Sequence, residues 1–267
     1  MRGRVLIAAG SDSGGGAGIQ ADVKTVTALA GFATTAITAL TAQNTFGVHS
    51  IEQVDPSFVA RQMEVVITDI GVDAVKTGML HNAAVIEVVE NAYRMYCNDV
   101  PLVVDPVMVA KGGAVLLQED AVDALKTYLI PQATVLTPNI PEAEVLSGIA
   151  IRDDTDVSRA AEKILAMGSA AVLITGGHRA GEKIVDTLRT SESQEQFESP
   201  RIDTRNTHGS GCTLASAIAT YLARGFSLSK SVGYARAFVH KAIVQAPGLG
   251  GGAGPLDHTH TVRTCSD

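Results

Sequence analysis

Short apolar runs alternate along the chain with segments in which apolar residues recur every three or four positions. The apolar runs predict buried strands at Val5–Ala9, Ala36–Leu40, Ala74–Thr77, Leu102–Val104, Thr134–Leu136 and Ala171–Ile174. The periodic segments predict helices at Ile19–Leu29, Pro56–Thr68, Val85–Tyr93, Pro141–Leu146, Val157–Met167, Gly211–Ala223 and Leu228–Gln245. Strands that alternate with helices build a mostly parallel sheet with helices on both faces, so we predict an α/β fold in three layers, α/β/α.

Two stretches interrupt this pattern. Glu182–Pro200 is more polar than its surroundings and predicts a hairpin at the edge of the sheet. Gly248–Gly254 predicts a turn, and the histidines after it, His258 and His260, are expected on an exposed terminus. A metal site in this tail is disfavoured, because two histidines are fewer ligands than a metal site needs. We find neither a long linker nor an internal repeat, so residues 1–267 are predicted to form a single domain.

Composition and charge limit the partners of the chain. The formal charge is −7, from 21 basic and 28 acidic residues, which argues against nucleic acid and anionic membranes as partners. Aromatic residues make up 4% and Trp is missing, so a platform for stacking bases is also disfavoured. The uncharged stretch between Lys24 and Glu52 is rich in threonine, which excludes a membrane span. Three scattered cysteines predict neither disulfides nor a metal knuckle, and they favour a cytoplasmic protein.

A glycine-rich loop follows the first predicted strand. Gly16–Ala21 matches G-x-G-x-x-A, the fingerprint of dinucleotide-binding proteins. That function requires an acidic residue near the end of the second strand, and Ala36–Gln43 contains none. Two interpretations remain: a tight turn without a ligand, or small residues that let a flat substrate lie against the backbone, with Asp22 one turn into the helix. The nearest match to a P-loop, at Gly176–Gly181, has Glu182 in place of the lysine.

A second glycine-rich segment precedes the helix predicted at Gly211–Ala223. The first N–H groups of a helix lack backbone partners and favour anions, and Gly209 and Gly211 permit close approach. Such amides can stabilise a phosphoryl group during transfer. Cys212 lies at this helix start, which predicts a pKa below the ordinary value of about 8.5 and allows the thiolate to accept a proton from a hydroxyl. A small buried residue in the first helical turn is an equally good interpretation of Cys212.

Asn206–Leu214 is similar to the signature of ribokinase-fold kinases, in which Gly-x-Gly is followed by a base that is commonly aspartate. Cysteine in that position resembles the hydroxymethylpyrimidine and phosphomethylpyrimidine kinases of thiamine biosynthesis. The resemblance extends over nearly the whole chain and includes Ala9–Ser13, Gly15–Thr25, Ile37–Thr45, Lys76–Leu80, Val104–Met108, Thr137–Ala143 and Gly176–His178. It implies a ribokinase-like fold, a homodimer, and ATP-dependent phosphorylation of 4-amino-5-hydroxymethyl-2-methylpyrimidine and then of its monophosphate.

The resemblance also implies roles for individual residues. Gln43 would bind the edge of the aminopyrimidine and Asp22 its hydroxyl or amine, within a substrate site made of Gly10, Ala17, Asp22, Gln43, Met79 and Val107. Cys212 would be the catalytic base, with Gly209, Ser210 and Gly211 completing the anion hole. The nucleotide would contact Asn139, Thr175, Gly177, Thr207, Gly209 and Gly211. An uncharged pocket of small and apolar residues suits a neutral heteroaromatic substrate.

The resemblance further implies a magnesium ion, held largely through water by Asp105 and Glu142, and a flap over the substrate at Lys111–Gly113. From its position alone, Glu142 is a routine acid in the first turn of a helix. The chain departs from the family in two places: Thr175 stands where many relatives have lysine, and Ala110 where some relatives active on pyridoxal have a second cysteine. The second departure favours the pyrimidine. A pyridoxal kinase on the same fold, or a pyrimidine-binding protein without catalysis, is the alternative.

Overall fold

The structure of the chain is a computed structural model, and it describes residues 3–109, 113–114 and 116–262. Within these residues, nine strands form one sheet in the order β3-β2-β1-β4-β5-β6-β7-β8-β9. The central strands are parallel: β1 (Arg4–Asp12), β2 (Phe32–Asn44), β4 (Ala74–Thr77), β5 (Leu102–Val104), β6 (Val135–Leu136) and β7 (Ala171–Ile174). Antiparallel strands flank them: β3 (Gly47–Gln53), β8 (Lys183–Thr190) and β9 (Gln194–Pro200).

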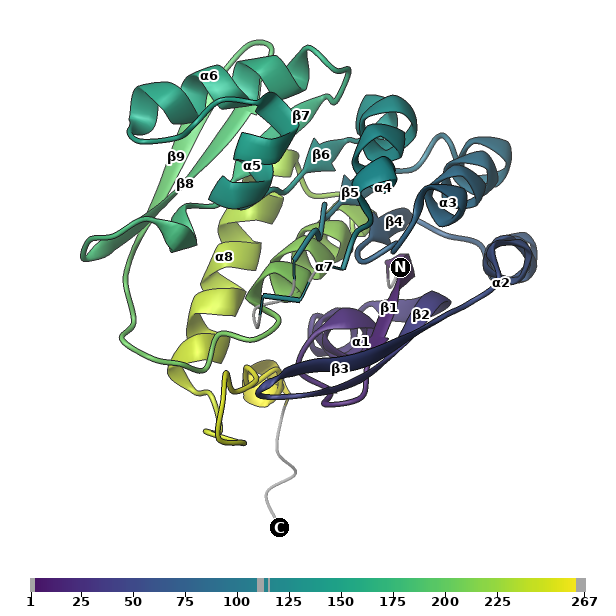
Figure 1. Cartoon of the computed structure of the whole chain (residues 1–267), viewed down its shortest axis with the longest axis horizontal. Coiled ribbons are helices and arrows are strands. Elements are labelled where there is room, and N and C mark those ends of the chain that lie inside the picture. Colours follow the sequence, from purple (N-terminus) through teal and green to yellow (C-terminus); the bar gives the residue numbers. More distant parts are fainter. Residues whose placement is uncertain (1–2, 110–112, 115, 263–267) are drawn as a thin grey trace.

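Helices cover both faces of the sheet (Figure 1). One face carries α1 (Gly18–Ala28), α7 (Ser210–Ala223) and α8 (Leu228–Val244). The other face carries α2 (Pro56–Asp69), α3 (Ala83–Tyr96), α4 (Glu119–Ala124), α5 (Ile140–Ser147) and α6 (Asp154–Leu165). Side chains alternate along β1, so that Leu6 and Ala8 pack in one core and Val5, Ile7 and Ala9 in the other. The predicted three-layer α/β/α fold is confirmed.

Local sequence explains where several helices begin. Asp55 caps α2 by accepting a hydrogen bond from Ser57 N at 2.8 Å, and Asn82 caps α3 in the same way through Val85 N at 2.9 Å. Asn139 begins α5 with a reciprocal capping box, which is described with the site below. These caps place the starts of three helices at the ends of the loops that follow strands.

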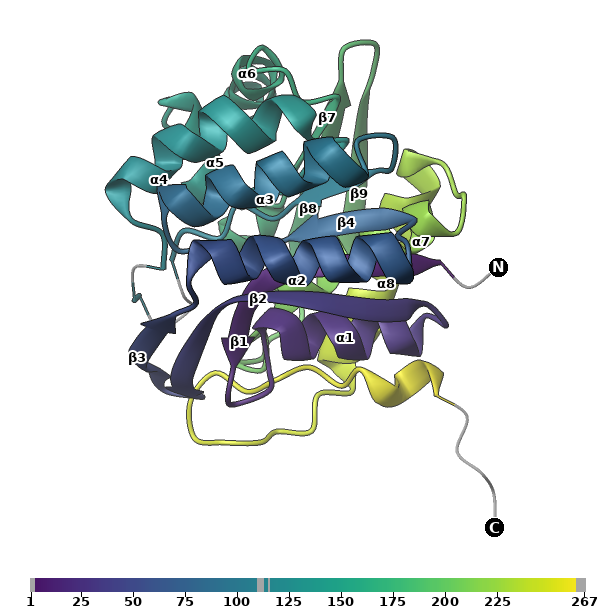
Figure 2. The same ribbon diagram turned by 90° about the vertical axis from the view of Figure 1, so that its right-hand side faces the viewer.

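The apolar runs at β4, β5 and β7 begin and end at the residues predicted from the sequence, and the edge hairpin is confirmed as β8 and β9. Two features differ from the prediction. β2 continues through a threonine-rich stretch to Asn44 and pairs with β3, which was not predicted because its side chains are largely polar. The prediction of an exposed C-terminal tail is wrong for His258, which is 5% exposed (Figure 2 shows the tail beneath α1).

The carboxyl ends of the parallel strands define one cavity. Asp12 ends β1, Gly78 follows β4, Asp105 follows β5, Thr137 follows β6 and Thr175 follows β7, and all five line a cavity of about 620 Å³. The chain turns from β2 on one side of β1 to β4 on its other side, so the cavity opens where the strand order reverses. Ligands of open α/β sheets bind at such a point. Among the described residues, no helix is both long and apolar enough to span a bilayer.

Candidate active site

The first glycine loop wraps around a carboxylate of its own chain. Asp12 accepts hydrogen bonds from the amides of Gly14 at 2.8 Å, Gly16 at 3.0 Å and Ala17 at 2.8 Å. Burial acts to raise the pKa of Asp12, but His208 and these amides outweigh it and lower the pKa. Because these three amides are occupied, the loop cannot bind a pyrophosphate as a dinucleotide-binding loop does. The structure thus agrees with the rejection of that function.

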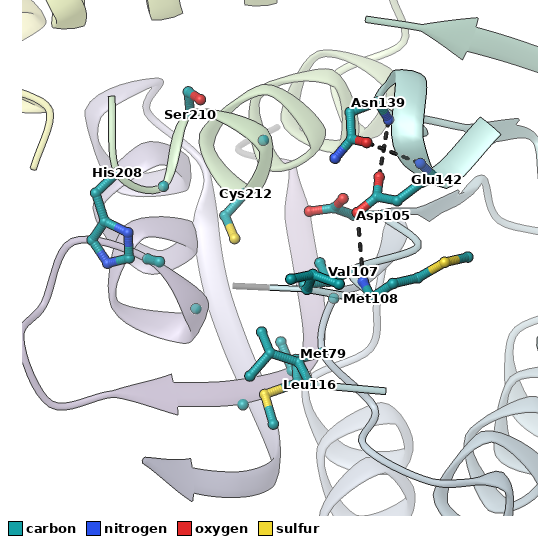
Figure 3. A pocket seen from close by; sticks show the side chains of 18 of the residues that line it. Met79, Asp105, Val107, Met108, Leu116, Asn139, Glu142, His208, Ser210 and Cys212 are labelled. Atoms are coloured by element: carbon teal, nitrogen blue, oxygen red, sulfur yellow. Dashed lines mark hydrogen bonds between the residues drawn. The ribbon is translucent and has the colours of Figure 1, made fainter. Parts of the chain in front are cut away.

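Most residues predicted for the substrate line one side of the cavity: Gly10, Ala17, Gln43, Met79 and Val107. Leu116 also lines it, although the sequence did not indicate this residue (Figure 3). A Cβ at Gly10 would lie 3.0 Å from Met79 Sδ, so the lack of a side chain at Gly10 leaves room in this part of the cavity. Gln43 Oε1 accepts from Thr41 Oγ1 at 3.1 Å, which orients the amide at the rim. This side of the cavity is apolar and suits a flat ring.

The predicted contact between Asp22 and the substrate is wrong. Asp22 is fully buried beneath the cavity, where it accepts hydrogen bonds from Lys76 Nζ at 3.0 Å and from Ser216 Oγ at 2.6 Å. The missed residue is Lys76, which lines the cavity floor and also lies 3.8 Å from Asp105 Oδ2. Burial opposes the charge of Lys76, but Asp22 and the neighbouring acidic groups raise its pKa. Lys76 is therefore protonated and positively charged at neutral pH.

The second glycine segment forms the opposite side of the cavity. Gly209 caps α7 with φ +82°, and a Cβ there would lie 1.9 Å from Gly16 O, so only glycine fits. Among the described residues, a Cβ at Gly211 would meet nothing within 4 Å beyond its own helix backbone and chain neighbours. Within the described chain, the amides of Gly211 and Cys212 donate to no acceptor, as expected at a helix start. The protein packing requires glycine at Gly209, whereas Gly211 leaves open space beside these amides.

Cys212 projects from α7 into the cavity, opposite Asp105 and Glu142 (Figure 3). The predicted decrease in its pKa is wrong. Burial raises the pKa of Cys212 to about 12, and Asp22 and Asp105 add to the increase, while Lys76 and the Gly18 amide act against it. The helix N-terminus alone does not overcome this desolvation. Cys212 is consequently a thiol at neutral pH.

Asp105 and Glu142 face one another at the carboxyl edge of the sheet. Burial raises the pKa of Asp105 to about 6, and burial together with Asp105 raises that of Glu142 to about 8. Glu142 Oε2 accepts from Asn139 N at 2.9 Å, and Asn139 Oδ1 accepts from Glu142 N at 3.0 Å (Figure 3). Glu142 thus has both the predicted capping position and a place at the cavity.

This carboxylate pair fits a divalent cation. Among the described residues, Asp105 Oδ2 is buried and accepts no hydrogen bond, so an oxygen ligand is available. Within the same residues, no three His, Cys, Asp or Glu side chains cluster as a metal site. Two carboxylates with water and phosphate completing the shell match the preference of Mg²⁺, which usually keeps several waters.

The predicted nucleotide residues are only partly brought together. Asn139, Thr175 and Thr207 line the cavity with Gly209 and Gly211, but Gly177 does not. His178, one residue further, lines it instead. Lys111, Gly112 and Ala110, which carry the predicted flap and the predicted substrate preference, lie outside the described residues.

The other two cysteines stand apart from this site. Cys97 is buried in the core beside α3, and burial raises its pKa to about 12, which keeps it a protonated packing residue. Cys265 lies outside the described residues.

Comparison with known proteins identifies the family. The family model for phosphomethylpyrimidine kinase matches residues 12–257. The chain is 48% identical over 254 residues to the hydroxymethylpyrimidine/phosphomethylpyrimidine kinase of Streptomyces coelicolor, covering 95% of this chain and 93% of that protein. It is 51% identical over 257 residues to the thiamine biosynthesis bifunctional protein ThiED of Geobacter sulfurreducens. That match covers 96% of this chain and 52% of the bifunctional protein, so this chain spans about half of its length.

Solved structures agree with the sequence relatives. Phosphomethylpyrimidine kinase from Clostridium difficile superposes with a TM-score of 0.80 at 41% identity, covering 91% of this chain and 100% of that chain. Pyridoxal kinase from Staphylococcus aureus in complex with pyridoxal superposes with a TM-score of 0.90 at 34% identity, covering 98% and 96%. The ribokinase-like fold and the class of enzyme predicted from the sequence, a phosphate-transferring kinase, are confirmed. The chain belongs to the phosphomethylpyrimidine kinase family.

Proposed function

We propose that this kinase transfers the terminal phosphoryl group of ATP to 4-amino-5-hydroxymethyl-2-methylpyrimidine and then phosphorylates the monophosphate to the pyrophosphate. Relatives are named for both phosphorylation steps, as hydroxymethylpyrimidine/phosphomethylpyrimidine kinases. Neighbouring pyridoxal kinases have been solved with AMP-PCP and with ADP, which supports ATP as the donor. The observation that carries the proposal is a cavity that joins an apolar side, a thiol and two amides that lack acceptors among the described residues.

We assign a different role to each side of the cavity. The apolar side, from Gly10 to Leu116, receives the pyrimidine ring, and Gln43 at the rim hydrogen-bonds to its polar edge. The amides of Gly211 and Cys212 receive the transferring phosphoryl group and stabilise its charge. Catalysis then rests mainly on positioning and on electrostatic stabilisation, as is general for phosphoryl transfer.

Cys212 is the proposed base for the substrate hydroxyl. Its thiol is protonated at neutral pH, because burial and two acids disfavour the thiolate. Lys76 on the cavity floor is the cation that favours the thiolate. Neutralising Asp105 would remove one of the charges that raise this pKa. We therefore expect Cys212 to act as a base only in the fully loaded site.

Asp105 and Glu142 are the residues that would hold Mg²⁺. A bound Mg²⁺ supplies charge neutralisation for the phosphate oxygens. Asn139 orients Glu142 through the capping box, so the position of this carboxylate is fixed by the helix itself. Thr175 and Thr207 provide neutral hydrogen-bond partners for the nucleotide, in place of the lysine expected at position 175.

A homodimer and a cytoplasmic location complete the proposal. Exposed apolar side chains at Leu40 and Phe46, near the β2–β3 turn beside the cavity, are consistent with a subunit contact. Sedimentation of the purified chain would show a dimer, and a monomer at all concentrations would contradict it.

The function is tested by ADP release with three separate acceptors: the pyrimidine, its monophosphate and pyridoxal. Pyridoxal is the second candidate because the pyridoxal kinase of Staphylococcus aureus superposes so closely. We expect kcat/KM to be higher for the pyrimidine and a second phosphorylation to follow the first. A higher kcat/KM for pyridoxal would assign the alternative activity.

The base is tested by Cys212→Ala, with Cys97→Ala as the matched control. Cys97 is buried in the core and remote from the cavity lining, so its variant changes stability and not turnover by folded enzyme. Cys212→Ala should retain binding of the pyrimidine and lose at least about 100-fold in kcat, the lower range for general-base catalysis. Turnover equal to the parent would refute the role of Cys212.

A further inference from the structure

The segment Gly248–His258 packs behind the anion hole. His208 N, next to Gly209, donates to Gly254 O at 3.1 Å. Ala253 N donates to Thr45 O at 2.8 Å, which joins the segment to the β2–β3 turn. The segment is therefore held at several points, and its path leads to a histidine directly behind the first turn of α7.

A chain of two hydrogen bonds connects that histidine to the anion hole. Thr213 Oγ1 lies 2.8 Å from Gly209 O and 2.9 Å from His258 Nε2. A hydroxyl has one proton, and a carbonyl oxygen can only accept, so the hydroxyl donates to Gly209 O. It must then accept from His258, which places the ring proton on Nε2. Burial lowers the pKa of His258 to about 4, so the ring is neutral at neutral pH.

The acceptor at the end of this chain is the carbonyl that sets the geometry of the hole. Gly209 O receives the Thr213 hydroxyl and also Thr213 N at 2.9 Å. The carbonyl and the next N–H belong to one rigid peptide plane. Fixing Gly209 O therefore fixes the first turn of α7, which carries the amides of Gly211 and Cys212.

We propose that His258 is a positioning residue for phosphoryl transfer, acting through Thr213 and Gly209 to hold the amides of the anion hole in place. The proposal rests on the proposed function in assigning these amides to the phosphoryl group. It gives the C-terminal segment a role in the site, although His258 does not line the cavity.

The test compares His258→Ala, His258→Gln and the control His260→Ala. Glutamine retains an N–H donor near the position of Nε2. His260 belongs to the same tail, but it packs on Phe238 with the ring centroids 4.5 Å apart, and its Nδ1 lies 3.0 Å from Asp257 O. We expect His258→Ala to lower kcat about 10-fold, a fraction of the loss seen when an oxyanion donor is removed outright, with KM for the pyrimidine changed less than about twofold. His258→Gln should recover most of kcat, and His260→Ala should equal the parent.

Binding provides a readout that does not depend on turnover. His258→Ala should weaken binding of AMP-PCP with Mg²⁺ about 10-fold and leave binding of AMP unchanged, because only AMP-PCP carries a terminal phosphate to the hole. Equal losses for the two nucleotides, or no loss for either, would overturn the proposal. If the parent enzyme fails to phosphorylate the pyrimidine, the proposed function fails, while this comparison still decides the role of His258.

Thr213→Val completes the test by removing the hydroxyl at nearly constant volume. Combined with His258→Ala, it should add little further loss in kcat, because both variants break the same chain of hydrogen bonds. Fully additive losses would show that His258 acts by another route. The ¹⁵N shifts of the parent should report a neutral ring protonated on Nε2, and the other tautomer would contradict the hydrogen-bond assignment.

Discussion

Replacing Lys76 with methionine tests the electrostatic design of the cavity floor. Methionine keeps most of the length of the side chain and removes the charge. Lys76 is fully buried, 3.0 Å from both carboxylate oxygens of Asp22 and 3.8 Å from Asp105. The variant leaves Asp22 without its cation at a site that water does not reach.

The magnitude follows from these distances. At an effective dielectric constant of about 20, a charge pair at 3.0 Å attracts by about 5 kcal/mol. Part of this is offset, because the variant no longer has to bury an ammonium group. Removing one partner of a buried ion pair costs about 3–5 kcal/mol in other proteins. We expect a loss of this size in the free energy of unfolding of the Lys76→Met variant.

Urea unfolding followed by circular dichroism measures this loss, with Lys24→Met as the control. Lys24 lies on the same helix as Asp22 but is exposed, and its Nζ bonds only to Gly15 O at 2.8 Å, so its loss should change stability by less than about 0.5 kcal/mol. Lys76→Met should also lower kcat, because the thiolate of Cys212 loses its nearby cation.

The double variant Lys76→Met with Asp22→Asn separates the two effects. Asparagine can still accept from Ser216 Oγ, and no unpaired carboxylate remains at position 22. Stability should then recover above that of Lys76→Met alone, while kcat stays low. A single variant within about 1 kcal/mol of the parent, or a double variant with recovered kcat, would refute this account of Lys76.

Two further predictions concern the glycines and the acid pair. The Gly211→Ala variant should have the melting temperature of the parent, because the added methyl group meets no neighbour among the described residues. Its KM for ATP should be higher, because the methyl group would occupy the space proposed for the phosphoryl group. Gly209→Ala, whose Cβ would meet Gly16 O at a positive φ, should lower the melting temperature, and equal behaviour of the two variants would contradict the assignment. The pKa of Glu142 is raised from 4.5 to about 8, so the folded protein keeps a proton that the unfolded chain loses. Without Mg²⁺, stability should therefore fall as the pH rises through that window, and Glu142→Gln should flatten the fall in calorimetry; an unchanged slope would count against it.

The parts of the fold that depend on continuous burial were predictable from the sequence. β4, β5 and β7 are buried on both faces; β5 and β7 are wholly apolar, and β4 begins with two apolar residues, so the runs could be recognised. β3 was not predictable in this way, because most of its side chains are exposed or half-buried and its register depends on pairing with the end of β2. Local pattern carries no information on such pairing.

The candidate site likewise contains residues that could be predicted from the sequence and residues that could not. Gly209 and Cys212 could be placed from the sequence because a helix start has a local signature. Asp22 was misassigned because its partner is 54 residues away. The sequence did contain a signal: Lys76 stands inside an apolar strand, and a charge there requires a buried counter-charge. The pKa of Cys212 depends on desolvation and on three charges brought together by the fold, which no local pattern reports.

The charges around the cavity explain why binding and stability should be linked in this kinase. Lys76 lies 3.0 Å from Asp22 and 3.8 Å from Asp105, and burial raises the pKa of both Asp105 and Glu142. Glu142 therefore retains a proton at neutral pH that a divalent cation would displace. A ligand that binds only the folded state stabilises it in proportion to its affinity. If Asp105 and Glu142 hold the metal as proposed, the carboxyl groups whose burial weakens the protein at alkaline pH would also bind the metal–nucleotide complex.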